Sequence, residues 1–401
     1  MAYQTASKIL VAARRETTSY SIATVTGAHT VRIIDSPGLE LDRAQIQSGE
    51  KRSDGLRAMM RLGYKSVTGS YNAEISVGGA TDMFLEAIQR GVWATATAIA
   101  FASVTSVTTG TNTVVAAGGD WVGSQNVRVG DVFYLTNHST SANNNVNARV
   151  TAVSSLTITV ATGTFVVDAV ADATGTLNFL KKLKSPATPT AYTHSIEQYD
   201  TDIDLSEVFL GCMCVGVKFS FKPGAMATVQ YTFLGTDRQA LASGASPYFT
   251  SPTLTTSLQL VADDSAIRYN GASVATFTGF DLDFTLTAKG EPVIGSLTTP
   301  QIFDNDLTVS GSVTGLRTDF SNLTLYDAET EFDLSILLQE PTGTPKAALG
   351  IFLPRVKISK LSAPVGGGDG AKIETLQLAM GPKDSAAGYD ASICTFHSSA
   401  A

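Results

Sequence analysis

The sequence has few charged residues, and its acidic residues outnumber its basic ones. Asp, Glu, Lys and Arg make up 16% of the 401 residues, and the formal net charge is -8 at pH 7. Non-specific affinity for nucleic acid comes from Lys and Arg side chains that displace counterions from phosphates. The charge balance therefore argues against a protein that holds DNA or RNA by its backbone.

Cysteine is equally scarce, with three residues in the chain: Cys212, Cys214 and Cys394. Cys212 and Cys214 would lie on the same face of one strand, roughly 6.5 to 7 Å apart, which is at or beyond the upper edge of disulfide reach. An odd, unpaired set fits folding in a reducing cytoplasm. Both residues lie in an apolar segment, where we expect them to be part of a buried core.

Histidine and catalytic motifs are also sparse. The four histidines, which never stand at metal-ligand spacing, are His29, His138, His194 and His397. The chain lacks a phosphate loop and a G-x-S-x-G elbow, and we interpret the glycine cluster at residues 366–370 as a flexible turn. Close carboxylates that could form a site, at Asp202 with Asp204 and at Asp263 with Asp264, are of a kind that usually caps turns. We therefore predict no catalytic residues, no metal and no cofactor.

The sequence contains no long run that is apolar throughout. Ile9–Val11 is followed at once by the charged segment Arg14–Glu16, which predicts that no signal peptide is present. The segment Gly91–Gly119 has no charged residue and exceeds the ~20 residues that span a bilayer, but it is rich in Thr, Ser and Asn. We expect two strands and a turn there, and no membrane insertion.

What the sequence does contain is the composition and periodicity of strands. Thr, Ser, Val and Ala recur in short runs, and the chain has 35 glycines. Apolar and polar residues alternate with period two, which predicts strands with one buried face, packed as a β-sandwich or a closed barrel. The alternating apolar residues are Val215, Val217, Phe219 and Phe221; Val229, Tyr231 and Phe233; Phe280, Leu282, Phe284 and Leu286; Leu307, Val309 and Val313; and Phe332, Leu334 and Ile336.

We divide the chain into residues 1–93, 94–180 and 181–401. The first part contains an unusually charged stretch between Arg43 and Arg61, interpreted as an exposed excursion, and ends in a short amphipathic helix that we expect to lie on the sheet. Thr81 is the expected N-cap of this helix and Gly91 its end. Its apolar face consists of Phe84, Leu85 and Ile88.

The second part, 94–180, is nearly free of charge and is predicted to be a small independent β-barrel. Its exit groups Lys181, Lys182 and Lys184 before two prolines, which is typical of a semi-rigid linker. A weak internal echo between YKSVTGSYNAEISVGG and VKFSFKPGAMATVQYTFLGTD, both interpreted as strand, turn and strand, suggests a duplication.

Several stretches, taken in order, resemble the bacteriophage tail tube proteins of long, siphophage-type tails. In the first part they are SGEKRSDGLRAMMRLGYKSVTGSYNAEIS and TDMFLEAIQRGVW. In the third part they are VFLGCMCVGVKFSFKPGAMATVQYTFLGTD, FTLTAKGEPVIGSLTTPQIFDNDLTVSGSVTGL, AETEFDLSILL, FLPRVKI and APVGGGDG. Residues 94–180 look like an insertion, for which the tube pattern predicts no role.

The resemblance implies a structural virion protein with a duplicated tube fold and no enzymatic activity. It implies rings of three or six subunits that stack into the tail tube and conduct DNA into the bacterial host without binding it. The implied partners are other copies of the chain, the tape measure protein, and the tail terminator and distal tail proteins. Such a chain would be made in the host cytoplasm and belong to the virion tail.

Within this interpretation we assign contact between stacked rings to the charged excursion, where opposite charges would fix rotational register. Its residues are Arg43, Glu50, Lys51, Arg52, Asp54 and Arg57. The insertion is placed outside the tube, because a folded unit of this size cannot sit in a lumen that DNA traverses.

Other classes remain open at this point. A surface adhesin or carbohydrate-binding β module would need exposed aromatics, for which Trp121, Phe133 and Tyr134 are candidates that we expect to be core instead. A tail-associated hydrolase lacks a nucleophile or acid pair. A capsid or sheath subunit would differ from a tube subunit in assembly geometry alone.

Overall fold

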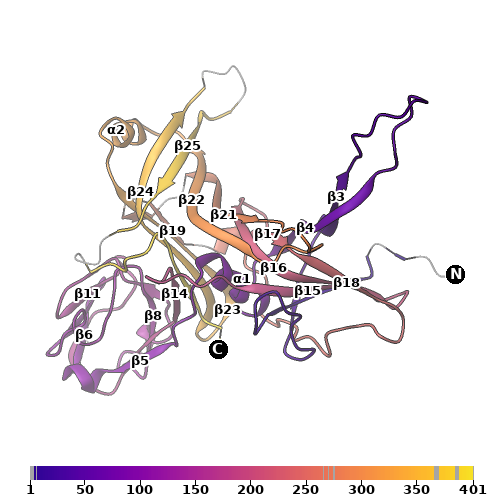
Figure 1. Ribbon diagram of the computed structural model, residues 1–401. Helices are drawn as coiled ribbons and strands as arrows, with labels where there is room; N and C mark the ends of the chain where they lie inside the picture. The colour runs from indigo at the N-terminus through magenta and orange to yellow at the C-terminus, as the bar shows by residue number, and fades with distance from the viewer. Residues whose placement is uncertain are drawn as a thin grey trace.

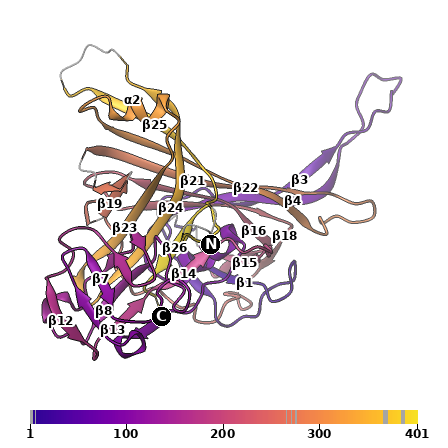
Figure 2. The same cartoon turned by 90° about the vertical axis from the view of Figure 1, so that its left-hand side faces the viewer.

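The computed structural model describes residues 4–400, except for residues 6, 265, 270, 274–275, 365–369 and 384–387. The described chain is built mainly of antiparallel strands with two short α-helices, which confirms the predicted mostly β fold class (Figures 1 and 2). A long two-stranded arm projects from the body on one side, and a compact group of short strands lies on the other side.

The body is a 17-stranded sheet that curves strongly (Figures 1 and 2). Its strands are β1 (Ile9–Arg15), β2 (His29–Val31), β3 (Gly38–Ile46), β4 (Arg61–Glu74), β14 (Lys181–Lys184), β15 (Thr193–Asp200), β16 (Leu205–Phe221), β17 (Thr228–Gly235), β18 (Asp237–Leu241), β19 (Ala266–Tyr269), β20 (Ala272–Ser273), β21 (Phe277–Gly290), β22 (Ile302–Leu316), β23 (Phe332–Gly343), β24 (Lys346–Ser362), β25 (Ile373–Met380) and β26 (Thr395–Ser398). The helices are α1 (Gly79–Gln89) and α2 (Ser321–Asp327), and a 3-10 turn, η3, covers Ala262–Asp264.

The strand β16 organises this sheet. Its first half pairs with β15 and β18, and its second half pairs with β17 and β21. The predicted alternation is confirmed here, since Val217, Phe219 and Phe221 are buried while Lys218 between them is exposed. Of the alternating apolar residues named above, only Val215 and Leu307 are half-buried, and the rest are buried.

Residues 97–179 form two further sheets around a core of their own. One sheet contains β6 (Val107–Thr109), β7 (Thr113–Ala116), β10 (Ala152–Val153), β11 (Thr157–Thr159) and β12 (Asp168–Asp172); the other contains β5 (Thr97–Ala100), β8 (Val132–Thr136), β9 (Ala148–Arg149) and β13 (Thr176–Phe179). Two 3-10 turns, η1 (Phe101–Val104) and η2 (Ser141–Asn143), connect strands. The strands form two separate ladders, so this part is a two-sheet sandwich rather than the predicted closed barrel. Trp121 and Phe133 lie in its core, as expected from the sequence, and are fully buried.

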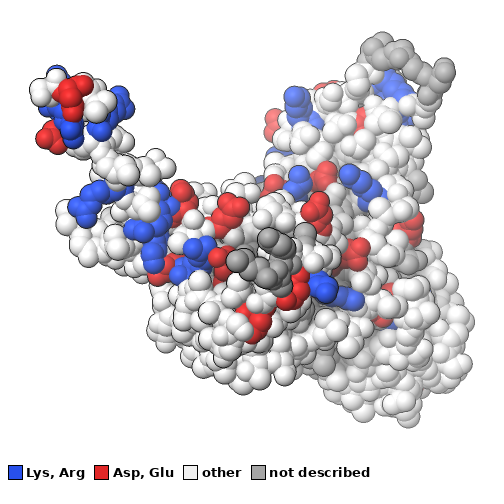
Figure 3. Space-filling model, turned by 90° about the vertical axis from the view of Figure 1, so that its right-hand side faces the viewer, with Lys and Arg blue, Asp and Glu red and all other residues white. Residues whose placement is uncertain are grey.

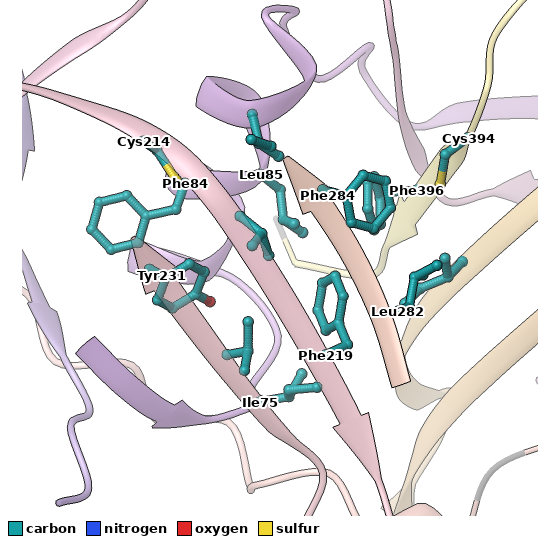
Figure 4. Packing of buried hydrophobic residues seen from close by; sticks show 14 of the residues in the cluster. Ile75, Phe84, Leu85, Cys214, Phe219, Tyr231, Leu282, Phe284, Cys394 and Phe396 are labelled. Atoms are coloured by element: carbon teal, nitrogen blue, oxygen red, sulfur yellow. The ribbon is translucent and has the colours of Figure 1, made fainter. Parts of the chain in front are cut away.

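The helix α1 packs on the inner face of the sheet, as predicted. Phe84, Leu85 and Ile88 are fully buried, and the Phe84 ring centroid lies 4.8 Å from that of Tyr231 and 5.0 Å from that of Phe233 (Figure 4). The predicted cap was wrong, because the helix begins earlier, after Gly78, and Thr81 lies inside its first turn.

The end of α1 also differs from the prediction. It is Arg90, in the left-handed conformation at φ 55°, and not Gly91 that closes the helix. The Arg90 side chain donates a hydrogen bond to Asp304 at 2.9 Å, and this contact holds a conformation that a sequence pattern would assign to glycine.

The two echo segments do not share a local structure. Residues 217–237 contain the predicted hairpin of β16 and β17, whereas residues 61–74 form the single strand β4 without a turn. The prediction of strand, turn and strand in the first segment was therefore wrong. The two segments instead pair with each other, from Val67 opposite Gly235 to Glu74 opposite Thr228. The duplication stays a prediction.

Cys212 and Cys214 lie in the core, as expected, and Cys394 lies there too. Cys212, Cys214 and Cys394 are all fully buried and carry free thiols. Burial raises the pKa of the Cys214 thiol to about 12, and it also raises those of the other two thiols. Figure 4 shows Cys214 beside Phe84 and Cys394 near Phe396, among apolar side chains.

The lysine-rich segment predicted as a linker is the strand β14, which pairs with β26 at the C-terminal end of the chain. Its lysines have buried or half-buried acidic partners from remote segments. The ion pairs are Lys181–Asp82 at 2.8 Å, Lys182–Asp131 at 2.8 Å, Lys182–Asp390 at 2.9 Å and Lys184–Asp390 at 2.7 Å. The prediction of a linker was wrong because the acidic partners of these lysines are distant in the sequence and could not be recognised from the local composition.

This ion-pair network joins the two-sheet sandwich to the body. Asp131 belongs to the sandwich, and besides Lys182 it contacts His397 Nε2 on β26 at 3.3 Å. Burial alone would raise the pKa of the Asp131 carboxyl, but the contacts with His397 and Lys182 outweigh burial and hold it below its ordinary value. The pKa of Asp390 is lowered in the same way by Lys182 and Lys184.

Removing one charge from this network is predicted to destabilise the fold. The substitution Asp131→Asn leaves the half-buried Lys182 with one carboxylate instead of two. We expect a loss on the order of 3 kcal/mol of unfolding free energy, measured by urea denaturation in dilute solution. Glu291→Gln is the matched control, because its ion pair with Lys289 is exposed, and it should leave the midpoint unchanged. Equal midpoints for both variants would contradict the assigned role of the network.

The network also predicts a pH dependence. Asp131 and Asp390 have lowered folded pKa values, so their contribution is complete above the ordinary carboxylate range and is lost as the pH falls through the folded values. The difference in urea midpoint between the wild type and Asp131→Asn should therefore shrink on going from about pH 6 to about pH 2. A difference that stays constant over this range would argue against the assignment.

Candidate assembly surface

The arm is a two-stranded ribbon that continues beyond the edge of the sheet. The strand β4 pairs with β17 only from Val67 to Glu74, whereas its pairing with β3 continues outward to Arg61 opposite Ile46. We call residues 38–66 the arm and residues 47–60 its tip. Among the described residues, no further strand pairs with the outer part of the ribbon, and the tip lies far from the body (Figures 1 and 2).

The base of the arm is held to the body by polar contacts of Lys65. Its Nζ atom lies 2.6 Å from Asp237 Oδ1, and its backbone N–H donates to Leu297 O at 2.8 Å. The pairing of β4 with β17 then transmits the position of the arm to β16 and the core. Because the base is anchored on both backbone and side chain, the direction of the arm is fixed by the sheet.

The six residues assigned to the excursion all lie on the arm. Arg43 is not in a loop but on β3, where its Nη2 donates to Gly63 O at 3.2 Å across the ribbon. The other five lie at the tip and are exposed: Glu50, Lys51, Arg52, Asp54 and Arg57. The sequence predicted the exposure of this stretch but missed that β3 and β4 extend into it from its two ends.

The tip contains one internal ion pair. Arg52 donates to both carboxylate oxygens of Asp54, at distances of 2.7 to 3.1 Å, and Asp54 also accepts from the Leu56 N–H at 3.0 Å. The Arg52 guanidinium, together with this N–H, holds the pKa of Asp54 below its ordinary value. Glu50, Lys51 and Arg57 are exposed and make no ion pair with any described residue. Figure 3 shows basic and acidic side chains gathered on the projecting tip.

Apolar side chains on the arm are the feature that sequence reasoning missed. Met59 is 89% exposed, Leu56 65% and Ile46 58%, and Met60 and Leu62 are also exposed. Large apolar residues that gather on a projecting element mark a protein contact. The signal was present in the sequence, as the segment LRAMMRL, but the surrounding charges concealed it.

A second exposed loop extends this apolar surface at the base of the arm. Ile294 is fully exposed and Leu297 is 57% exposed, and the loop touches β4 through the Lys65–Leu297 hydrogen bond. The arm and this loop together present apolar residues along one side of the molecule, with no covering element in the described chain.

The close carboxylates that were expected to cap turns make hydrogen bonds within the chain. Asp204 accepts hydrogen bonds from Ser243 and Gly244, and Asp263 accepts from Gly224, so these carboxylates cap turns. Asp202 accepts from the Thr5 N–H. Residues 366–369 of the glycine cluster lie outside the described residues. Among those that are described, no group of three or more His, Cys, Asp or Glu residues could hold a metal ion, and no helix has the length and apolar character to cross a bilayer.

Comparison with known families decides the class of the protein. A family model described as phage tail tube protein matches residues 6–381. The chain belongs to the phage tail tube protein family. No curated protein matches it.

Membership confirms the resemblance inferred from the sequence. Tail tube proteins are structural components of the virion tail, and the mostly β fold described above agrees with this assignment. The matched range includes the arm and also the two-sheet sandwich at residues 97–179. The arm is therefore part of a tail tube protein, and its exposed apolar residues require an explanation in terms of assembly.

The isolation of the tip predicts that the fold does not need it. Ile46 and Arg61 are directly opposite in the ribbon, so the dipeptide Asn-Gly in place of residues 47–60 would close it with a two-residue turn. We expect the shortened chain to unfold at the same urea concentration as the wild type, within the error of circular dichroism measurements. A clearly lower midpoint would mean that the tip packs on the body.

Proposed function

We propose that this tail tube protein forms rings that stack into a tube and that the arm carries the contact between successive rings. The observation that supports this proposal is the arm itself, a ribbon with exposed apolar and charged residues that no other element of the described chain covers. From Val67 to Arg61 the ribbon continues for six residues, which is about 20 Å at the rise of a strand, before the tip begins. Such a length reaches a neighbouring subunit.

Mixed charge at the tip suits a contact that has to select one rotation of the next ring. When opposite charges lie close together, a wrong rotation of the next ring brings like charges into contact. This repulsion costs more free energy than the matched charges contribute in the correct rotation. The apolar side chains of Leu56 and Met59 would supply the affinity, because burial of apolar area is the main driving force of association. The arm thus combines the two requirements of a stacking contact.

The proposed tube conducts DNA into the bacterial host without holding it. The net charge of -8 per chain, repeated around a ring, repels phosphates and keeps affinity low. We place the two-sheet sandwich on the outside of the tube and expect no catalysis. Rings of three or six subunits are both compatible with this role, and the further partners are the tape measure, tail terminator and distal tail proteins.

The test is negative-stain electron microscopy of the purified chain at high concentration. The wild type should form hollow tubes or stacked rings, whereas the chain with Asn-Gly in place of residues 47–60 should stop at monomers or single rings. Arg52→Glu should impair stacking because it breaks the ion pair with Asp54 and reverses a charge at the tip. Lys222→Glu, the reversal of an exposed charge in the turn between β16 and β17, is the matched control and should assemble normally.

Two outcomes would contradict the proposal. Tubes formed by the shortened chain would remove the arm from the stacking contact. A wild type that forms no rings or tubes, with or without the tape measure and initiating tail proteins, would contradict the structural role in assembly.

A further inference from the structure

The same series of strand pairings occurs twice along the described chain. In the first set, β3 pairs with β4, β4 with β17, β17 with β16 and β16 with β15. In the second set, β21 pairs with β22, β22 with β25, β25 with β24 and β24 with β23. The helix α1 follows β4 and α2 follows β22, so the order of elements is the same in both sets.

The two sets also correspond residue by residue, because β-bulges recur at matching positions. The bulge between Cys214 and Gly216 on β16 corresponds to the one between Ile358 and Lys360 on β24. A second bulge, in the hairpin of β3 and β4, recurs at the same place in the hairpin of β21 and β22. Counted from these bulges, β24 takes the place of β16, and β3 takes the place of β21.

One pairing joins the two sets within the chain. The strand β16 of the first set pairs with β21 of the second set along residues 216–221 and 280–285. Near the start of this junction Val217 lies opposite Phe284, and both side chains are fully buried. The junction shows which edges of this fold fit together, since a strand in the position of β16 accepts a strand in the position of β21.

The corresponding edges at the two ends of the sheet have no partner strand in the described chain. The strand β3, the counterpart of β21, pairs with β4 alone, and residues 357–362 of β24, the counterpart of β16, pair with β25 alone. Figures 1 and 2 show β3 and β24 at opposite ends of the sheet, too far apart to pair within one chain. One copy can therefore offer its β3 to the β24 of another copy.

The side chains on these two edges are complementary in the register of the internal junction. In that register Lys360 lies opposite Asp42, and Leu361 lies opposite Leu41. Both leucines are half-buried at the margin of the core, whereas their counterparts in the internal junction are fully buried. Lys360 and Asp42 are exposed and make no ion pair with a described residue. Pairing would bury the two leucines and bring opposite charges together.

The backbone of both edges permits this ladder. The Gln198 side chain bonds the N–H and C=O of Leu39 at 3.0 and 3.3 Å, from the side of β3 that faces away from β4. Because backbone groups of a strand alternate in direction, Leu41 directs its N–H and C=O to that same outer side. On β24 the ladder ends at Pro364, which has no N–H and falls opposite Gly38, beside the position that Gln198 already fills.

We propose that β24 of one copy pairs in antiparallel orientation with β3 of the next, so that the junction between copies repeats the junction within the chain. The contact is heterologous, and such contacts form a ring when the rotation between copies closes. The inference rests on the proposed ring. It adds that the base of the arm joins neighbours within a ring, whereas the tip contacts the next ring. The pairing also covers two strand edges that are otherwise open to unspecific association.

Cysteine cross-linking tests this register, because the three native thiols are buried. Asp42→Cys and Lys360→Cys replace exposed side chains, and residues opposite each other in an antiparallel ladder have Cα atoms about 4.5 to 5.5 Å apart, within disulfide reach. Under mild oxidation the two variants should give a linked dimer at least tenfold more abundant than Asp42→Cys mixed with Val170→Cys, which is exposed on the two-sheet sandwich. A chain with both cysteines should give a ladder of linked copies.

A charge exchange supplies the second measurement. Asp42→Lys places a lysine opposite Lys360, and Lys360→Asp places an aspartate opposite Asp42, so each single variant brings like charges together. Each should reduce the rings counted in electron micrographs at least fivefold, because the repulsion recurs at every junction of a ring, and the double variant should restore them. Unchanged urea midpoints will show that the variants fold, and Lys222→Glu is the control that should form rings normally.

The shortened chain separates this inference from the proposed stacking. With Asn-Gly in place of residues 47–60 it keeps β3, so it should still form the cross-link between positions 42 and 360. If that chain also stacks into tubes, the pairing stands and the stacking role of the arm fails. Wild-type rings without the cross-link and without the rescue would overturn the pairing of β3 with β24 and leave the stacking function standing. Absence of wild-type rings under every condition would count against both.

Discussion

The structure depends on the pairing of one long strand with four others. Because β16 is flanked by β15 and β18 along its first half and by β17 and β21 along its second half, it fixes the orientation of both ends of the sheet. Its alternating apolar residues meet α1 on the inner face, so the same strand sets the core. The arm is connected to β16 indirectly, because β17 pairs with β4, which is one of the two strands of the arm. The direction of the arm follows from this pairing.

The two-sheet sandwich is attached by a different kind of interaction. Its own core is apolar, and the cluster of Lys182, Asp131, Asp390 and His397 links it to the body. A small apolar cluster, in which Val132 packs with Leu337 and Ala348, adds to this link. Buried charges tolerate little change in geometry, since each needs its partner at hydrogen-bond distance. The sandwich is therefore attached to the body by side-chain contacts as well as by the chain connections at its two ends.

The sequence predicted best what depends on local pattern. The alternation around Phe219 and Phe284 identified strands because successive side chains of a strand point to opposite faces of the sheet, so the sequence itself shows which face is buried. The exposure of the stretch from Arg43 to Arg61 followed from its charge. Contacts between distant segments could not be predicted in this way. The segment around Lys182 has the composition of a linker, and its role in the sheet becomes clear only when its partner Asp390 is known. A cavity beside α1 is likewise lined by residues from both ends of the chain.

The burial of the cysteines determines how the protein reacts to an oxidising medium. A thiol reacts with oxidants and disulfides as the thiolate, and the raised pKa of Cys212, Cys214 and Cys394 keeps all three protonated as well as shielded. A subunit that folds without disulfides can thus enter an oxidising medium unchanged. Its durability there does not depend on disulfides, so neither air nor reducing agents should alter these three cysteines in an assembled tail built from it.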